Sequence, residues 1–129
     1  MSEESTARIK LLLVDDEVAY VNVLANRMAK RGIDVTKALS GTEGIQALRK
    51  EDFDAAILDL KMEDMDGIEV LKVFKKMVPT LPVIMLTGHG SEKAAREGLE
   101  FGAFGYLTKP CDLEELVEKI KKAIRSERS

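Results

Sequence analysis

Four short apolar runs that each stop at a polar or charged side chain constrain the fold of this chain most strongly. Runs of this length are typical of strands that are buried on both faces of a sheet. The runs 11–14, 55–58, 83–86 and 106–108 end, in chain order, at the pair Asp15 and Asp16, at Asp59, at Thr87 and at Lys109. Because the carboxyl ends of parallel strands lie along one edge of a sheet, we expect these side chains to converge there, in the crevice where α/β proteins bind ligands.

The segments between the runs have helical patterns, so strands and helices alternate along the chain. The predicted strands span 9–14, 33–38, 54–58, 83–86 and 106–108, and the predicted helices span about 17–31, 40–50, 67–77, 91–101 and 112–124. This alternation predicts a single doubly wound α/β domain with a parallel sheet. We expect residues 8–125 to form the domain, residues 1–7 to be a mobile tail and residues 126–129 to be a second tail.

Local signals define several of the predicted helices. Ser40 followed by Glu43 is a capping box, in which two side chains satisfy backbone amides at a helix start. Ser91 is expected to cap the fourth predicted helix with its hydroxyl group. The first predicted helix is expected to bury one face, from Val18 to Met28.

The composition fits one compact domain without a membrane, nucleic-acid or zinc-binding signature. The chain of 129 residues, 45% of them hydrophobic, has the length of a single domain. Its apolar runs are too short to span a membrane and its acidic start does not resemble a signal peptide, so a cytoplasmic protein is expected. The net charge of -3 argues against direct binding to nucleic acid. One cysteine, Cys111, and one histidine provide no cluster of soft ligands for zinc.

The side chains at the predicted edge suggest phosphate chemistry assisted by a hard cation. Three neighbouring aspartates repel one another, and Mg2+ relieves this repulsion because it prefers carboxylate oxygens and phosphate as ligands. With a cation bound, the carboxylate of Asp59 can attack phosphorus and carry the group as an acyl phosphate. Lys109 would neutralise the phosphoryl oxygens, Thr87 would donate a hydroxyl group and Gly88 would leave room beside them.

Four motifs in a fixed order closely resemble the receiver domain of bacterial response regulators, over residues 8–125. The ordered set is far more specific than any one of its motifs. The motifs are LLLVDDE at 11–17, DLKM at 59–62 with MDG at 65–67, LTG at 86–88, and GA at 102–103 with YLTKP at 106–110. The resemblance implies a flavodoxin-like, doubly wound sheet of five parallel strands in the order 2-1-3-4-5, with five flanking helices.

The resemblance also implies a role for each polar residue at the edge. Asp59 would be the phosphoacceptor, which receives its phosphoryl group from a histidine kinase. Asp16 would bind Mg2+ directly, Asp15 mainly through water, and Lys61 through its backbone carbonyl group. Thr87, Gly88 and Lys109 would surround the phosphoryl oxygens.

Further residues gain roles in switching and in the lifetime of the phosphorylated state. Tyr106 would swing inward when Thr87 is drawn toward the phosphoryl group, and the surface of the fourth helix, fifth strand and fifth helix would change. The Lys109–Pro110 peptide bond would be cis. Lys61 and His89, two residues after Asp59 and Thr87, flank the approach of water and would set the lifetime.

Two positions in the loop after Asp59 and one after Pro110 depart from the common pattern of the family. Glu63 and Asp64 stand where proline and glycine are frequent, so we expect more negative charge near the metal and a looser turn. Cys111 stands where phenylalanine is common, and we interpret it as a small buried hydrophobic residue.

Four functions are compatible with these residues to different degrees. The first is a phosphorelay switch that catalyses only its own phosphorylation and dephosphorylation and is not an enzyme for outside substrates. A Mg2+-dependent phosphatase would need an acid where Lys61 stands, and a flavin carrier would meet two repelling aspartates, Asp15 and Asp16. A degenerate receiver that docks partners without phosphorylation is the main alternative, kept open by Glu63 and Asp64.

The partners follow from the first of these functions. A sensor histidine kinase or a phosphotransfer protein would supply the phosphoryl group. The output would be a separate effector protein or a C-terminal output domain outside this sequence, and neither membrane nor nucleic acid is an expected partner of this chain. A phosphorylation-linked dimer through the face of the fourth helix, fifth strand and fifth helix is a further hypothesis.

Overall fold

The computed structural model describes residues 8–88 and 90–128, which form five strands alternating with five helices. The strands are β1 Ile9–Val14, β2 Ile33–Ala38, β3 Ala55–Asp59, β4 Val83–Thr87 and β5 Gly105–Thr108. The helices are α1 Val18–Ala29, α2 Gly41–Lys50, α3 Gly67–Met77, α4 Glu92–Glu100 and α5 Leu113–Arg128. None of the helices in this part of the chain is long and apolar enough to cross a membrane.

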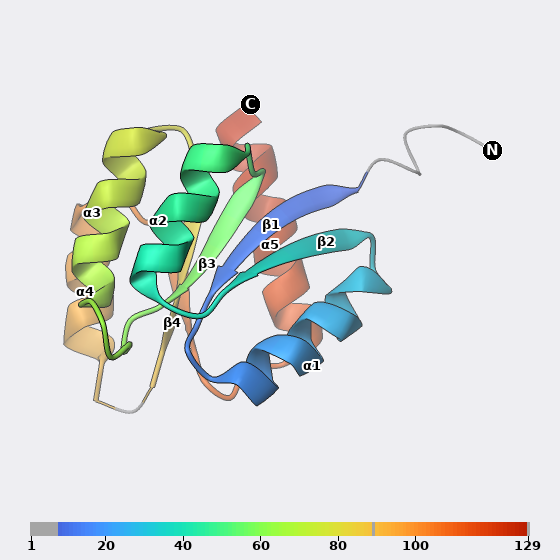
Figure 1. Cartoon of the computed structure of the whole chain (residues 1–129), viewed down its shortest axis with the longest axis horizontal. Coiled ribbons are helices and arrows are strands. Elements are labelled where there is room, and N and C mark those ends of the chain that lie inside the picture. Colours follow the sequence, from blue (N-terminus) through green and yellow to red (C-terminus); the bar gives the residue numbers. More distant parts are fainter. Residues whose placement is uncertain (1–7, 89, 129) are drawn as a thin grey trace.

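The strands form one parallel sheet in the order β2-β1-β3-β4-β5, which confirms the predicted fold (Figure 1). β3 lies at the centre, where Leu58 pairs with Val14 of β1 on one side and with Met85 of β4 on the other. The register also aligns the end of β3 with the end of β4, since Asp59 pairs with Leu86. The loops after β1, β3, β4 and β5 therefore meet along one edge of the sheet, at the bottom of Figure 1.

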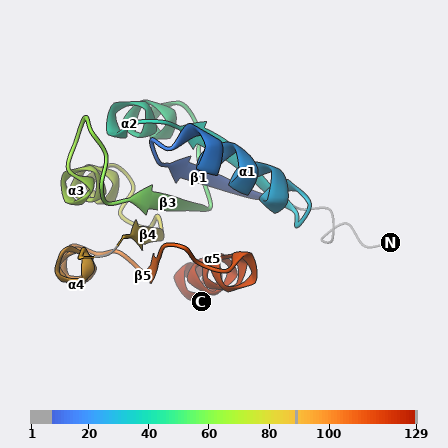
Figure 2. The same ribbon diagram turned by 90° about the horizontal axis from the view of Figure 1, so that it is seen from below.

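Helices cover both faces of the sheet, with α2, α3 and α4 on one side and α1 and α5 on the other (Figure 2). Alternate residues of β1, β3 and β4 enter two separate apolar cores. Phe74 of α3 packs with Leu12 and Leu58 in the first core, and Ile120 of α5 packs with Leu11 and Ile57 in the second. Burial of the central strands on both faces explains why their sequences are continuous apolar runs rather than alternating patterns.

Of the two predicted helix caps, the cap of α2 is confirmed and the cap of α4 is wrong. At α2, the hydroxyl oxygen of Ser40 accepts from the amide of Glu43 at 3.1 Å, and the Glu43 carboxylate accepts from the amide of Leu39 at 2.8 Å, so the capping signal is confirmed. The predicted cap of α4 is wrong, because the Ser91 side chain makes no capping hydrogen bond to the described residues. Ser91 is instead buried, with a backbone conformation that is not extended.

The end of α5 and the inner face of α1 also differ from the sequence prediction. The expected tail at 126–129 is wrong for residues 126–128, because α5 continues to Arg128, whose guanidinium group donates to Asp54 at 2.6 Å. Val18 is 53% exposed at the first turn of α1, and Leu24 is buried on the inner face together with Met28. The expected mobile tail at 1–7 lies outside the described residues.

Candidate functional site

Three carboxylates meet at the edge of the sheet where the strands end. Asp15 and Asp16 follow β1, and Asp59 is the last residue of the neighbouring strand β3. One oxygen from each of the three lies within 4.8 Å of the others. Asp15 is fully buried and Asp59 is 6% exposed, whereas Asp16 is partly exposed. The predicted convergence of the three aspartates is therefore present, with Asp16 on the solvent side.

Lys109, from the end of β5, places its ammonium group beside these carboxylates. Its Nζ atom donates to Asp15 Oδ2 at 2.7 Å and to Glu17 Oε1 at 2.8 Å, and it lies 3.7 Å from Asp59 Oδ2. It also lies 4.6 Å from the centre of the Tyr20 ring. The cation is thus shared between the buried cluster and the exposed first turn of α1.

Burial and like charge change the acidity of the cluster. Burial, together with the neighbouring charge of Asp15, raises the pKa of Asp59 to about 6, although Lys109 opposes this change. Burial lowers the pKa of Lys109, but hydrogen bonds to Asp15 and Glu17 outweigh that effect and raise it overall. Without a further cation, the ionised form of Asp59 is therefore less favourable than that of an aspartate in water.

Thr87 is the last residue of β4, the strand beside β3, and is fully buried. Its hydroxyl group donates to the carbonyl of Leu107 at 3.4 Å and is 3.5 Å from the hydroxyl of Thr108. Both distances are long for an O–H···O hydrogen bond, so the hydroxyl is weakly held. Gly88 follows, and a Cβ at that position would meet no atom of the described residues within 4 Å.

Tyr106 lies on β5, and the cis peptide bond predicted before Pro110 is present. Tyr106 is half-buried on β5 and packs against the core that lies under α2, α3 and α4. The Lys109–Pro110 peptide bond is cis, and the amide of Lys109 donates to the carbonyl of Thr87 at 2.7 Å. His89 lies outside the described residues.

The loop between β3 and α3 closes on itself beside the carboxylates. Lys61 pairs with Asp66 in an isolated bridge, and its amide donates to Asp59 Oδ1 at 3.2 Å. The amide of Glu63 donates to Asp16 Oδ2 at 3.3 Å. Gly67 is required at the end of the loop, because a Cβ there would lie 2.5 Å from the backbone Cα of Leu60.

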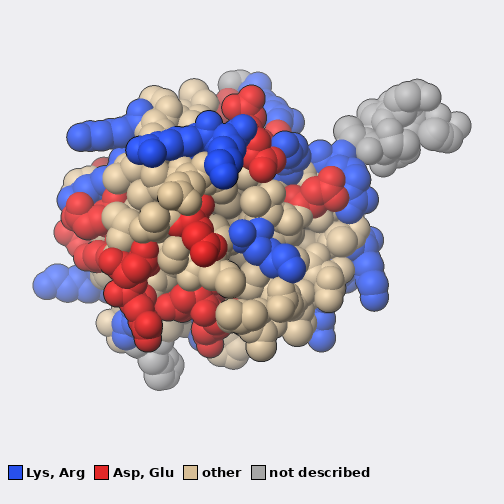
Figure 3. Space-filling view, viewed as in Figure 1, with Lys and Arg blue, Asp and Glu red and all other residues tan. Residues whose placement is uncertain are grey.

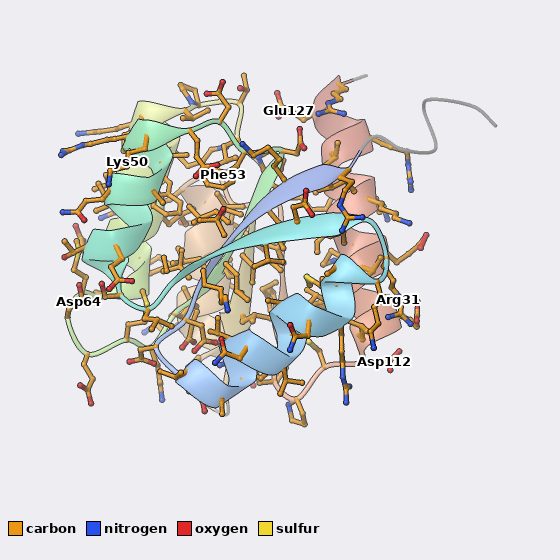
Figure 4. All side chains as sticks on the ribbon, turned by 45° about the vertical axis from the view of Figure 1, so that its right-hand side comes forward. Arg31, Lys50, Phe53, Asp64, Asp112 and Glu127 are labelled. Atoms are coloured by element: carbon orange, nitrogen blue, oxygen red, sulfur yellow. The ribbon has the colours of Figure 1, made fainter. Side chains whose placement is uncertain are left out.

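Asp64 does not loosen the loop, which corrects one sequence prediction. Its carboxylate accepts from the amides of Gly41 and Thr42 at 2.9 and 3.1 Å, and from the Thr42 hydroxyl at 3.0 Å. Hydrogen bonds from these two amides lower the pKa of Asp64. Figure 4 shows Asp64 beside the first turn of α2. The negative charge of Asp64 is thus directed to a helix N-terminus, where it is favourable.

The side chain of Cys111 packs against the core under α1 and α5 but is only partly buried, so its interpretation as a small buried hydrophobic residue is confirmed in part. Burial raises the pKa of its thiol. Burial, with a contribution from Cys111, also raises the pKa of the neighbouring Tyr20 to about 12.

Two residues at the site, Glu17 and Tyr20, were not predicted from the sequence. Glu17 stands next to the two aspartates in the first motif, and Tyr20 follows it by three residues, one helical turn later. The helical spacing provided a signal that both would face the end of β5. Their contact with Lys109 depends on the tertiary structure.

The site combines a buried carboxylate, two further carboxylates with hard oxygen donors, an ammonium group and a weakly held hydroxyl group. Figure 3 shows acidic side chains gathered at the lower left of the molecule, where the loop after β3 lies in Figure 1. An acidic rim with such a donor set suits a hard divalent cation better than a soft one.

Comparisons with known proteins agree with this arrangement. The family profile described as "Response regulator receiver domain" matches residues 11–121. The transcriptional regulatory protein GlrR of Escherichia coli (strain K12) is 40% identical over 114 residues, which cover 88% of this chain and 26% of that protein. The chain spans about a quarter of the length of the curated relatives that it matches.

Solved structures of isolated receiver domains match almost end to end. A response regulator receiver domain protein from Clostridium thermocellum is 34% identical with a TM-score of 0.89, and the match covers 93% of this chain and 97% of that one. A CheY-like receiver domain protein from Methanospirillum hungatei JF-1 is 31% identical with a TM-score of 0.89, over 94% of this chain and 97% of that one. The profile, the relatives and the fold agree, and the chain belongs to the response regulator receiver domain family of two-component systems.

Proposed function

We propose that Asp59 accepts a phosphoryl group from the phosphohistidine of a histidine kinase or a phosphotransfer protein, in a Mg2+-dependent reaction. The observation that supports this most directly is the position of Asp59 between a cation and two further carboxylates. Lys109 lies 3.7 Å from it, and oxygens of Asp15 and Asp16 lie within 4.8 Å. This set provides a nucleophile together with the groups that neutralise a phosphoryl anion.

The residues present fit Mg2+. Asp16 and Asp59 would bind the ion directly, Asp15 mainly through water, and the backbone carbonyl of Lys61 would complete the share of the protein. The raised pKa of Asp59 reflects burial and like charge, which a divalent cation would offset. When bound, Mg2+ would supply positive charge opposite the phosphoryl oxygens and hold the group in place.

The chain itself would contribute the nucleophile and the stabilising donors. One carboxylate oxygen of Asp59 forms the new P–O bond while the P–N bond of phosphohistidine breaks. The histidine nitrogen keeps the electron pair and takes a proton from water. Lys109 turns from Asp15 and Glu17 toward the phosphoryl oxygens, to which Thr87 donates its hydroxyl hydrogen. Hydrolysis of the acyl phosphate would follow when water attacks its phosphorus, and Lys61 and His89 would set the rate of this step.

Phosphorylation would change the face formed by α4, β5 and α5. The added group carries about -1.5 to -2 charges and provides strong acceptor oxygens. The Thr87 hydroxyl, whose two contacts measure 3.4 and 3.5 Å, is readily redirected to such an acceptor. Tyr106 then moves into the space that Thr87 leaves, and the new surface meets the partner.

The output would be an effector protein or an output domain. Relatives named transcriptional regulatory proteins are about four times as long as the matched segment, which supports regulation through a further domain. A phosphorylation-linked dimer would use the same face, where Leu107, Glu118 and Lys119 line a shallow hollow of about 240 Å³. Static light scattering with and without beryllofluoride tests this dimer.

An enzyme acting on outside substrates is not proposed. Lys61 stands where an aspartyl-phosphate phosphatase would need an acid to protonate the leaving group. The degenerate docking module loses part of its support, since the Asp64 carboxylate binds the start of α2 and adds no unpaired charge beside the aspartates.

Incubation with Mg2+ and acetyl phosphate, followed by mass spectrometry, tests the proposed function. The expected result is a gain of one phosphoryl group that requires Mg2+ and is absent in Asp59→Asn. Asp54→Asn is a matched control at the opposite end of β3 and should still gain the group. No gain with acetyl phosphate, phosphoramidate or a phosphorylated kinase would favour the docking module.

A further inference from the structure

We propose that Asp64 is a positioning residue, which holds the loop between β3 and α3 against α2 and thereby prepares the Mg2+ site. This inference rests on the proposed function, because it concerns the ion that phosphorylation of Asp59 would require. Asp64 would touch neither the ion nor the phosphoryl group. It would act through the loop residues Lys61 and Glu63.

The first step of the argument is the attachment of the loop to α2. Asp64 accepts three hydrogen bonds from the start of that helix: from the Gly41 amide at 2.9 Å, the Thr42 amide at 3.1 Å and the Thr42 hydroxyl at 3.0 Å. These amides are among those that a helix cannot satisfy internally. The carboxylate also carries the charge that the helix N-terminus favours.

The second step is the close packing that accompanies these bonds. A Cβ at Gly41 would lie 3.1 Å from the Cβ of Met65 and 2.8 Å from Cγ2 of Val70. The residue next to Asp64 is therefore already in contact with the first residue of α2, which leaves the loop little freedom to shift. Ser40 caps the same helix end independently, so α2 does not depend on Asp64 to begin.

The third step connects the loop to the metal ligands. The residue before Asp64 is Glu63, whose amide donates to Asp16 Oδ2 at 3.3 Å. Lys61, which would supply a backbone carbonyl to the ion, is held in the same loop by its bridge to Asp66. A hydrogen bond to a ligand and the placement of a ligand carbonyl are both features that tune metal affinity.

Glu63 provides a matched control for the charge of Asp64. Both are exposed acids in the same loop and adjacent in the sequence. Glu63 uses its backbone amide, rather than its side chain, to reach Asp16. Glu63→Ala therefore removes one negative charge from the loop and leaves the attachment to α2 in place.

The test is the dissociation constant of Mg2+ for the wild-type chain, Asp64→Ala, Asp64→Asn and Glu63→Ala, measured by titration calorimetry. We expect about tenfold weaker binding in Asp64→Ala. Asp64→Asn keeps one acceptor oxygen and loses the other, so it retains only one of the two amide bonds and should weaken binding by an intermediate amount. Glu63→Ala should bind within about twofold of the wild type. Equal weakening in Asp64→Ala and Glu63→Ala would overturn the proposal, because charge alone would then account for both.

A second measurement on the wild-type chain keeps the proposal testable if Asp64→Ala does not fold. By reciprocal linkage, Mg2+ must strengthen the attachment if the attachment strengthens Mg2+ binding. Saturating Mg2+ should slow hydrogen exchange at the amides of Gly41 and Thr42 more than at Glu43, which Ser40 caps at the same helix end. Equal slowing at the three amides would contradict the proposed link.

The result also separates this inference from the proposed function. If the wild-type chain binds Mg2+ and gains a phosphoryl group while Asp64→Ala binds Mg2+ equally well, only the role of Asp64 is wrong. If the wild-type chain shows no saturable Mg2+ binding, the Mg2+-dependent function is wrong, and the role of Asp64 is wrong with it.

Discussion

Lys109 donates a hydrogen bond of 2.7 Å to Asp15, a carboxylate with no exposed surface, across 94 positions of the sequence. Asp15 lies too deep for water to solvate its charge, so the ammonium group from β5 performs that role. The same ammonium group is needed at the phosphoryl oxygens in the proposed reaction. Once Asp59 carries a phosphoryl group, the Asp15 carboxylate and the phosphoryl oxygens therefore compete for the ammonium group of Lys109.

Removal of the Lys109 charge should destabilise the metal-free protein. In Lys109→Met the buried Asp15 carboxylate loses its ion pair, and we expect the free energy of unfolding to fall by about 3 kcal/mol. Glu17→Gln removes the exposed partner of the same ammonium group and should cost less than about 1 kcal/mol. Urea denaturation at pH 7.5 in EDTA measures both variants. Equal effects would contradict the assignment of Asp15 as the dominant partner.

Removal of the Asp59 charge should have the opposite effect, with a defined pH dependence. The pKa of Asp59 is about 6 in the folded chain and 3.8 ordinarily, so the folded state binds the proton more tightly than the unfolded state. Ionised Asp59 therefore destabilises the metal-free fold above pH 6, and this penalty disappears as the pH falls toward 3.8. Asp59→Asn should be more stable than the wild type by about 2 kcal/mol at pH 7.5 and equally stable near pH 4.

The effect of Mg2+ provides the control for the Asp59 prediction. A ligand that binds only the folded state stabilises it by an amount that grows with the ratio of the ligand concentration to the dissociation constant. Addition of Mg2+ should therefore raise the melting temperature of the wild type more than that of Asp59→Asn, and chelation with EDTA should reverse the change. An Asn variant that is less stable than the metal-free wild type at pH 7.5 would contradict the raised pKa.

Gly67 should tolerate no side chain. The Cβ of Gly67→Ala would lie 2.5 Å from Cα of Leu60, and backbone atoms cannot move aside as a flexible side chain can. We expect a loss of about 2 to 3 kcal/mol in the free energy of unfolding. Gly88→Ala is the matched control, because a Cβ there meets open space in the described structure and its φ is not positive. Chemical denaturation of both variants measures the difference.

Thr87 should separate acceptance of the phosphoryl group from the change of surface. Thr87→Ala keeps the nucleophile and loses the hydroxyl donor, so we expect slower phosphorylation, by about tenfold to a hundredfold, and no shift of Tyr106 on phosphorylation. Thr87→Ser keeps the donor and should restore both properties. NMR signals of the Tyr106 ring, with and without beryllofluoride, report the shift. A Tyr106 shift of wild-type size in Thr87→Ala would contradict the coupling.

The sheet and the gathering of the aspartates could be predicted because they depend on local patterns. Apolar runs of strand length specify buried parallel strands, and parallel strands bring their last residues to one edge whatever the loops do. The meeting of Asp59 with Asp15 and Asp16 follows from these rules. The same holds for Ser40 and Glu43, whose capping interaction lies within a few residues of the chain.

The contacts that the sequence did not predict join segments that are distant in the chain. The sequence predicts that the charge of Asp64 adds to the metal side of its loop, yet the carboxylate faces the start of α2, 22 to 23 positions earlier. Arg128 extends α5 beyond the predicted end through an ion pair with Asp54. A periodicity or a motif cannot show either contact, because the orientation of a surface side chain depends on which neighbour the fold supplies.

The sheet divides the interior into two apolar cores, and no side chain of residues 8–88 and 90–128 belongs to both. Substitutions under α1 and α5 should therefore combine additively with substitutions under α2, α3 and α4, since energetic coupling requires contact or a shared partner. Each core can therefore accept substitutions while the packing of the other core stays unchanged. Because α4 and α5 rest on different cores, a domain of this kind can remodel one half of the face formed by α4, β5 and α5 and keep the other half as it is.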